Sequence, residues 1–90
     1  AVDALYEVGA YYLKQGNYDE AIKAYQQFIY NYPKEDRVED AMLAVARCYV
    51  EKKTWDKALD AYQSYLAKYP NGKSAEFAKA QIAWIRMYHF

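Results

Sequence analysis

One segment of this sequence occurs twice, and the second copy begins thirty-seven residues after the first. Each copy contains a turn, an aromatic residue, an acidic residue, a face of spaced alanines and tyrosines, and a closing Tyr-Pro pair. Aligning residues 1–37 with 38–74 gives eleven identical positions, mostly at helical spacing: Asp3/Asp40, Ala4/Ala41, Val8/Val45, Tyr12/Tyr49, Asp19/Asp56, Ala21/Ala58, Ala24/Ala61, Tyr25/Tyr62, Gln26/Gln63, Tyr32/Tyr69 and Pro33/Pro70. The chain therefore contains an internal repeat.

The spacing of apolar residues predicts five helices with short turns, over residues 2–15, 18–32, 37–52, 55–69 and 75–89. Proline ends the second and fourth helices, because its ring removes a backbone donor and disfavours a helical residue before it. Asn17 with Glu20 has the pattern of a capping box. The other predicted N-caps are Asp36, Thr54 and Ser74. No segment has a convincing strand pattern, so the predicted fold class is all-α.

The predicted helices have inner faces that repeat. The first and third helices carry Leu5, Val8, Gly9 and Tyr12, then Met42, Val45, Ala46 and Tyr49. The second and fourth carry Ala21, Ala24, Tyr25, Phe28 and Tyr32, then Ala58, Ala61, Tyr62, Tyr65 and Tyr69. Small residues let two helix backbones approach closely, and each neighbouring tyrosine ring buries a large area. We therefore expect the tyrosine stripes to form the core.

These faces carry a family resemblance. Both copies, over essentially the whole chain, resemble the tetratricopeptide repeat signature, with a period three residues longer than the usual thirty-four. The resemblance implies an α-solenoid in one domain, residues 1–90, with repeats at 1–37 and 38–74 and a capping helix at 75–90. The Tyr-Pro ends and the connections at 34–37 and 71–74 look like a bacterial cell-envelope subset. Examples are the periplasmic coordinator of the Tol–Pal system and the lipoprotein of the outer-membrane β-barrel assembly machine.

The first and the last predicted helices differ in the polarity of their outer sides. Residues Lys79 and Arg86 stand where the earlier helices have apolar or aromatic side chains, which predicts that residues 75–90 form a water-exposed cap. The first helix shows no such polar change on the side that would meet a preceding repeat, where it carries Ala4, Val8 and Tyr11. We expect this open side to meet another repeat or another subunit.

The amino-acid composition limits the kinds of partner that the chain could bind. The twelve basic and twelve acidic residues give zero formal net charge, whereas a nucleic-acid or anionic-membrane surface normally has a basic excess. No apolar run approaches the roughly 18 residues that cross a bilayer. The N-terminal sequence has no signal-peptide pattern and no initiator methionine, which indicates a processed or excised piece. Localisation is therefore open, and only the resemblance suggests the periplasm or cell envelope.

The sequence contains few side chains that could take part in catalysis. His89 is the only histidine and lies next to the C-terminal residue, where we expect it to be solvated. Cys48 is the only cysteine, at a position between repeats where a buried thiol is expected. The acidic residues around Arg37 lack the spacing of a calcium loop and are interpreted as solvated charges at a helix start. We predict no enzymatic activity, no cofactor and no metal.

Recognition is the predicted function. In stacked helix pairs the first helix of each pair lines the concave face. We therefore predict a partner-binding groove with this lining: Tyr6, Ala10, Leu13, Leu43, Arg47, Val50, Phe77, Ala80, Trp84 and Tyr88. Asp3, Asp40 and Met87 fall on the same face. Trp84 is equally consistent with covering the third helix within the domain.

Two functions remain open from the sequence. In the first, the chain is an adaptor that binds a peptide or helix of a partner protein on its concave face, and Arg47 is the central cation. In the second, it is a natural or designed self-assembly element that uses the first or the fifth helix. The chaperone-type members of the family hold a C-terminal carboxylate, but Ala10 and Arg47 stand where that pattern has Asn. That clamp is therefore not assigned.

Overall fold

A computed structural model describes residues 2–90, with side chains from residue 4 onward. The described residues form five helices and no strand: α1 (Val2–Gln15), α2 (Tyr18–Asn31), α3 (Arg37–Glu51), α4 (Trp55–Lys68) and α5 (Ala75–His89). The all-α prediction is confirmed. The bounds of α1 and α5 match those expected, and the other three helices end one residue earlier. Tyr32 and Tyr69 leave the helix with φ of −132° and −126°, because each precedes a proline.

The predicted capping residues occupy the N-cap positions, but none of them makes a side-chain capping hydrogen bond. The capping-box prediction at Asn17 is therefore wrong. Asn17 and Thr54 have ψ of 74° and 77°, short of the extended ψ that brings an N-cap side chain over the first turn. The backbone N–H of Asn17 instead donates to the backbone carbonyl of Tyr12 in α1, and that of Thr54 donates to the carbonyl of Tyr49 in α3, at 2.9 Å each.

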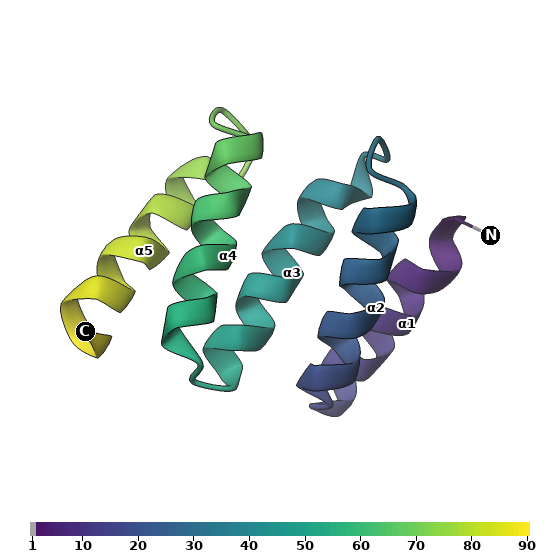
Figure 1. Ribbon diagram of the computed structural model, residues 1–90, viewed down its shortest axis with the longest axis horizontal. Coiled ribbons are helices and arrows are strands. Elements are labelled where there is room, and N and C mark those ends of the chain that lie inside the picture. The colour runs from purple at the N-terminus through teal and green to yellow at the C-terminus, as the bar shows by residue number, and fades with distance from the viewer. Residues whose placement is uncertain (1) are drawn as a thin grey trace.

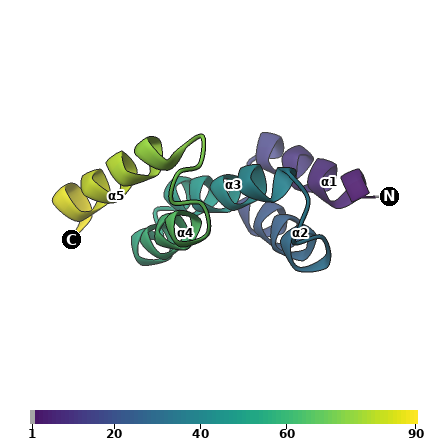
Figure 2. The same ribbon diagram turned by 90° about the horizontal axis from the view of Figure 1, so that it is seen from above.

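The helices follow one another in a row from α1 to α5, and each packs against the next one in the chain (Figure 1). Seen from above, α1, α3 and α5 lie on one side and α2 and α4 on the other (Figure 2). We call these sides the first-helix face and the second-helix face. The assembly measures 40 × 28 × 16 Å, so it is a thin slab with two broad surfaces. This arrangement is that of an α-solenoid of two helix pairs and a fifth helix.

Two hydrophobic clusters form the core, one between α2 and α3 and one among α3, α4 and α5. Tyr25, Phe28, Tyr62 and Tyr65 are buried in them, as predicted. Gly9 allows α1 to approach α2, since a Cβ atom there would lie 2.9 Å from the Tyr25 ring.

Several residues expected on the inner faces are only partly buried: Leu5, Tyr12, Tyr32, Met42, Tyr49, Ala61 and Tyr69. Val8 is 43% exposed, because no described helix covers that side of α1. In α5, Lys79 and Arg86 are exposed, as expected for the outer side of a terminal helix. No helix of the described residues is long and apolar enough to cross a membrane.

Candidate functional site

The first-helix face is hollowed along its middle. A hollow of about 260 Å³ is lined by Leu13, Asp40, Leu43, Ala44, Arg47, Tyr62 and Phe77. A second hollow of about 600 Å³ lies beside it and is lined by Glu7, Ala10, Tyr11, Leu13, Lys14 and Arg47. Because Leu13 and Arg47 line both hollows, the two adjoin each other, and we call them together the first-helix groove. It runs from α1 across α3 to Phe77 of α5.

Five of the ten groove residues predicted from the sequence line this groove: Ala10, Leu13, Leu43, Arg47 and Phe77. Three helices supply them, and the spacing along each helix places their side chains on one face. Asp40 also lines the groove, whereas Asp3 lies outside the residues whose side chains are described. Sequence reasoning missed Tyr62 of α4, because its alanine–tyrosine pattern indicated only core packing.

The structure places Tyr6 elsewhere. Its ring meets the rings of Tyr25 and Phe28 edge-on, with centroids 5.5 and 5.6 Å apart, and the Arg37 guanidinium carbon lies 5.0 Å from its ring centroid. A long helical side chain leans toward the N-terminus of its own helix. Tyr6 is therefore part of the contact between α1 and α2 and does not line the groove.

Trp84 and Tyr88 belong to an aromatic cluster at the C-terminal end of α5. This terminal aromatic cluster consists of Trp55, Trp84, Tyr88 and His89. The His89 ring stacks on Trp55 with centroids 3.6 Å apart and an interplanar angle of 12°, and it meets Trp84 edge-on at 4.8 Å. Trp84 also contacts Trp55 at 5.6 Å and Tyr88 at 6.2 Å. The expectation of a freely solvated His89 is thus wrong, because stacking on the indole half-buries the imidazole.

The remaining residues of the prediction do not line the groove either. Val50 is partly buried and packs against the core cluster among α3, α4 and α5. Ala80 is exposed on α5, as is Met87. The structure therefore places five residues of the predicted set in a groove centred on Arg47 and Trp84 and Tyr88 in the terminal aromatic cluster, while Tyr6, Val50 and Ala80 belong to neither.

Arg47 is the main charged feature of the groove. Its side chain is exposed and makes no ion pair with any described carboxylate. Asp40 lies in the same groove, but its carboxylate is 2.7 Å from Lys73 Nζ, and this contact raises the pKa of Lys73. Burial raises the pKa of Tyr62, and the guanidinium of Arg47 opposes part of this rise. Arg47 is thus available to an anionic group of a ligand.

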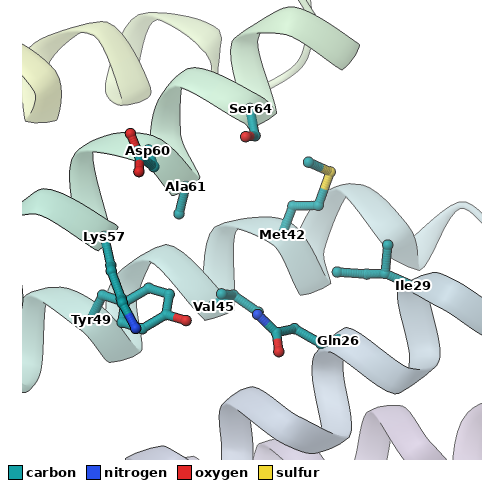
Figure 3. A pocket seen from close by; sticks show the side chains of 9 residues that line it. All are labelled: Gln26, Ile29, Met42, Val45, Tyr49, Lys57, Asp60, Ala61 and Ser64. Atoms are coloured by element: carbon teal, nitrogen blue, oxygen red, sulfur yellow. The ribbon is translucent and has the colours of Figure 1, made fainter.

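The second-helix face has a hollow that the sequence did not predict. It encloses about 330 Å³ and is lined by Gln26, Ile29, Met42, Val45, Tyr49, Lys57, Asp60, Ala61 and Ser64. Figure 3 shows the α2 residues on one side and the α4 residues on the other, with those of α3 between them. Among the described residues α2 and α4 do not contact each other, so the partly buried side chains of Met42 and Tyr49 are reachable from outside, whereas Val45 is buried. The small side chains of Ala61 and Ser64 are the sequence feature that could have indicated this hollow.

The described residues provide little for catalysis. No group of three or more His, Cys, Asp or Glu side chains among them could hold a metal ion. Cys48 is fully buried, as expected, and burial raises the pKa of its thiol to about 11. A thiol of that kind forms little thiolate near neutral pH and is a poor nucleophile.

Of the acidic residues near Arg37, Glu35 and Asp36 are exposed as expected, and Glu39 and Asp40 lie in the first turn of α3 as expected but are not merely solvated. Glu39 Oε2 accepts hydrogen bonds from the Tyr65 hydroxyl at 2.5 Å and from the backbone N–H of Lys73 at 3.0 Å. Asp40 pairs with Lys73. These side chains attach the loop before α5 to the first turn of α3, so their role is structural.

The fold and the groove define a helical-repeat protein with a surface suited to binding and no evident catalytic constellation among the described residues. A family model described as Tetratricopeptide repeat matches residues 1–36 and 9–73. The chain belongs to the tetratricopeptide repeat family. No curated protein was found to match the sequence. Repeats of this family generally mediate protein–protein interactions and are typically scaffolds without enzymatic activity.

Proposed function

We infer that this chain is an adaptor whose first-helix groove binds a peptide or helix of a partner protein. The observation that carries the proposal is the position of Arg47. This cation pairs with no described carboxylate and lines both hollows. Leu13, Leu43 and Phe77 give the smaller hollow an apolar wall, whereas Glu7 and Lys14 also line the larger one. Arginine and aromatic side chains are frequent energetic anchors of protein interfaces.

The groove suggests the chemistry of the bound segment. A hollow of about 260 Å³ between Leu43 and Phe77 suits one apolar side chain. Arg47 suits an acidic side chain, since its planar guanidinium can donate two parallel hydrogen bonds to a carboxylate. We therefore propose a ligand segment with one apolar and one acidic residue close together. Binding of a free C-terminal carboxylate is not part of the proposal, because Ala10 and Arg47 replace the Asn residues of that clamp.

A displayed library of random peptides can test the proposal without knowledge of the natural partner. Selection on the wild-type protein is expected to enrich peptides that combine an acidic and an apolar residue. Peptides selected in this way should lose at least tenfold in affinity for Arg47→Glu and for Leu43→Lys, about 1.4 kcal/mol or more. Tyr30→Ala is the matched control, because Tyr30 is 85% exposed on α2 and lines no groove. Equal affinity for wild type and both groove variants would refute peptide binding at this site.

Self-association is the second candidate function. Tyr11 on α1 is 59% exposed, and Met87 and Tyr88 form an exposed apolar surface on α5. Light scattering at several concentrations measures the mass directly. A protein that remains monomeric at all of them is not a self-assembly element. A mass that rises with concentration and falls back in Tyr11→Glu or Trp84→Ala would favour self-association.

The proposal also includes a cell-envelope location, which rests on the Tyr32-Pro33 and Tyr69-Pro70 ends and the loops that follow them. The division into repeats at 1–37 and 38–74 and a cap at 75–90 likewise stays a prediction. Separation of periplasmic from cytoplasmic fractions in the source cells, with immunodetection of the protein, tests the location. Recovery only with cytoplasmic markers would contradict it.

A further inference from the structure

Small side chains of α4 leave the hollow on the second-helix face open. Ala61 and Ser64 line it from α4, and larger side chains at these two positions would fill it. Among the described residues α2 and α4 do not contact each other, so α3 forms the floor between them (Figure 3). This hollow shares no lining residue with the first-helix groove. The two can therefore be occupied independently.

The size of the hollow excludes a helix as its occupant. It encloses about 330 Å³. A single helical turn with its side chains is about 10 Å wide and 5.4 Å long, and so occupies roughly 420 Å³. The hollow instead has the volume of about eleven water molecules at roughly 30 Å³ each. That is room for one aromatic ring with a short chain, at the lower end of the range for small-molecule sites.

The floor of the hollow suits an aromatic ring. Met42 and Tyr49 are seven residues apart on α3, so they lie on one helical face, and both side chains are only partly buried. A thioether sulfur makes favourable contacts with aromatic rings, and a tyrosine ring packs edge-to-face or offset against another ring. Ile29 of α2 adds an apolar wall. A flat ring on this floor would contact all three side chains.

A lysine without an acidic partner stands at one end of the hollow. Figure 3 shows the Lys57 side chain extending toward the Tyr49 ring, whereas the Asp60 side chain stays beside α4. Lys57 forms no ion pair with any described carboxylate. It also lines an adjoining hollow of about 300 Å³ with two further lysines, and these do have acidic partners: Lys23 with Glu20, and Lys52 with Asp19. The charge of Lys57 is therefore available to an anionic group of a ligand.

We propose that this hollow binds a small aromatic carboxylate. The ring of the ligand packs on Met42 and Tyr49, and its carboxylate pairs with the ammonium group of Lys57. Gln26 and Ser64 supply neutral hydrogen-bonding groups for further polar atoms of the ligand. The bound molecule contacts both α2 and α4, and so joins two helices that otherwise do not meet. The site is separate from the adaptor function and does not depend on it.

The methyl signals of the two methionines test the proposal directly. Met42 lines the hollow, and Met87 is exposed on α5. Protein labelled with ¹³C at the methionine methyl groups is titrated with 3-phenylpropionate up to about 20 mM, because a ligand of this size binds in the millimolar range. We expect the Met42 signal to shift to saturation and the Met87 signal to stay in place. The uncharged 3-phenylpropan-1-ol and the non-aromatic 3-cyclohexylpropionate should each bind at least threefold more weakly.

Four variants locate the binding site. Ala61→Leu fills the hollow and should abolish the Met42 shift, and Ser64→Leu, at an exposed position, is a second closing variant. Lys57→Glu should weaken binding of 3-phenylpropionate at least threefold and leave that of the alcohol unchanged. Lys34→Glu is the control, because it makes the same change of charge at an exposed position outside the hollow.

Three results would overturn the proposal: no saturable Met42 shift, equal affinity for the three compounds, or binding that persists in both closing variants. A Met42 signal that shifts with protein concentration, together with a dimer in light scattering, also overturns it, because a second copy of the chain then occupies the hollow.

Discussion

The Tyr65 hydroxyl donates a hydrogen bond to Glu39 Oε2 at 2.5 Å, and so joins α4 to the first turn of α3. The same oxygen of Glu39 accepts a bond from the backbone N–H of Lys73, and the Tyr65 oxygen accepts one from the backbone N–H of Ser74 at 3.1 Å. Two side chains thus attach the loop that leads into α5. The first repeat has no equivalent, because Phe28 stands at the position of Tyr65 and has no hydroxyl.

This network predicts the effect of Tyr65→Phe. The ring would still fill its place in the core, but Glu39 would lose one of two donors and Ser74 its acceptor. We expect the free energy of unfolding to fall by about 1.5–3 kcal/mol, the range for a hydrogen bond to a charged group. Urea denaturation followed by circular dichroism measures the change. Tyr30→Phe on the exposed side of α2 is the control and should have no effect, and an equally stable Tyr65→Phe would show that the network contributes nothing.

The helices could be predicted closely because their signals are local. Apolar spacing marks the inner faces, and the Tyr-Pro pairs mark two ends. The network around Glu39 could not be predicted, since Glu39 and Tyr65 are twenty-six residues apart and meet only through the packing of α3 against α4. The stack of His89 on Trp55 is similar, because it depends on where the last turn of α5 comes to lie.

The groove was predictable in part for the same reason. Register alone puts Leu13, Leu43 and Arg47 on one face, and the structure places all three in the groove. Register cannot say how far a side chain leans along its helix or which aromatic neighbour it meets. Tyr6 and Trp84 have the right register, but ring contacts with Tyr25 and Trp55 hold them elsewhere. The open hollow between α2 and α4 depends on their separation, which no sequence pattern specifies.

Gly9→Ala tests the close approach of α1 to α2. A Cβ atom at this position would lie 2.9 Å from three atoms of the Tyr25 ring, which is buried and cannot move aside easily. Alanine improves helix propensity by about 1 kcal/mol, whereas overpacking costs about 1–3 kcal/mol. We expect net destabilisation, measured as a lower urea midpoint with an unchanged m-value. A more stable variant would mean that α1 shifts without loss of contacts.

Lys53→Gly should stabilise the protein. Lys53 has φ of 60°, in the left-handed region that costs an L-residue about 1–2 kcal/mol. Its repeat counterpart is Gly16, with φ of 79°. Part of the gain is offset because glycine adds freedom to the unfolded chain, so the expected net increase is about 0.5–1 kcal/mol. Gly16→Ala is the reciprocal variant and should lower the urea midpoint. A decrease in stability for Lys53→Gly would contradict the proposed strain.

Alkaline pH is expected to unfold the protein through its buried tyrosines. Burial raises the pKa of Tyr25 to about 12, and also raises the pKa of Tyr62. The folded-state pKa therefore lies above the unfolded value near 10. The corresponding stability is present below pH 10 and is lost as pH rises from about 10 to 12, because the unfolded chain releases protons first.

Phenolate absorbance and circular dichroism, recorded over the same pH titration, measure this loss. Exposed tyrosines such as Tyr30 should ionise first, and the buried ones only as helicity is lost. Tyr25→Phe removes one of the linked groups and should move the unfolding midpoint to higher pH. Ionisation of all twelve tyrosines near pH 10 with helicity retained would contradict the assignment.

Deletion of residues 75–90 should leave a chain that is insoluble or does not fold cooperatively. Ala78, Ile82 and Ile85 of α5 form one buried cluster with Ala58, Tyr62 and Tyr65 of α4, so the deletion would expose the apolar side of α4. It would also loosen the loop whose Lys73 and Ser74 backbone N–H groups donate to Glu39 and Tyr65. Solubility, sedimentation and urea denaturation of residues 1–74 measure the result. A soluble fragment that unfolds cooperatively would refute the role of α5 as a cap, because a repeat array needs its terminal apolar face covered.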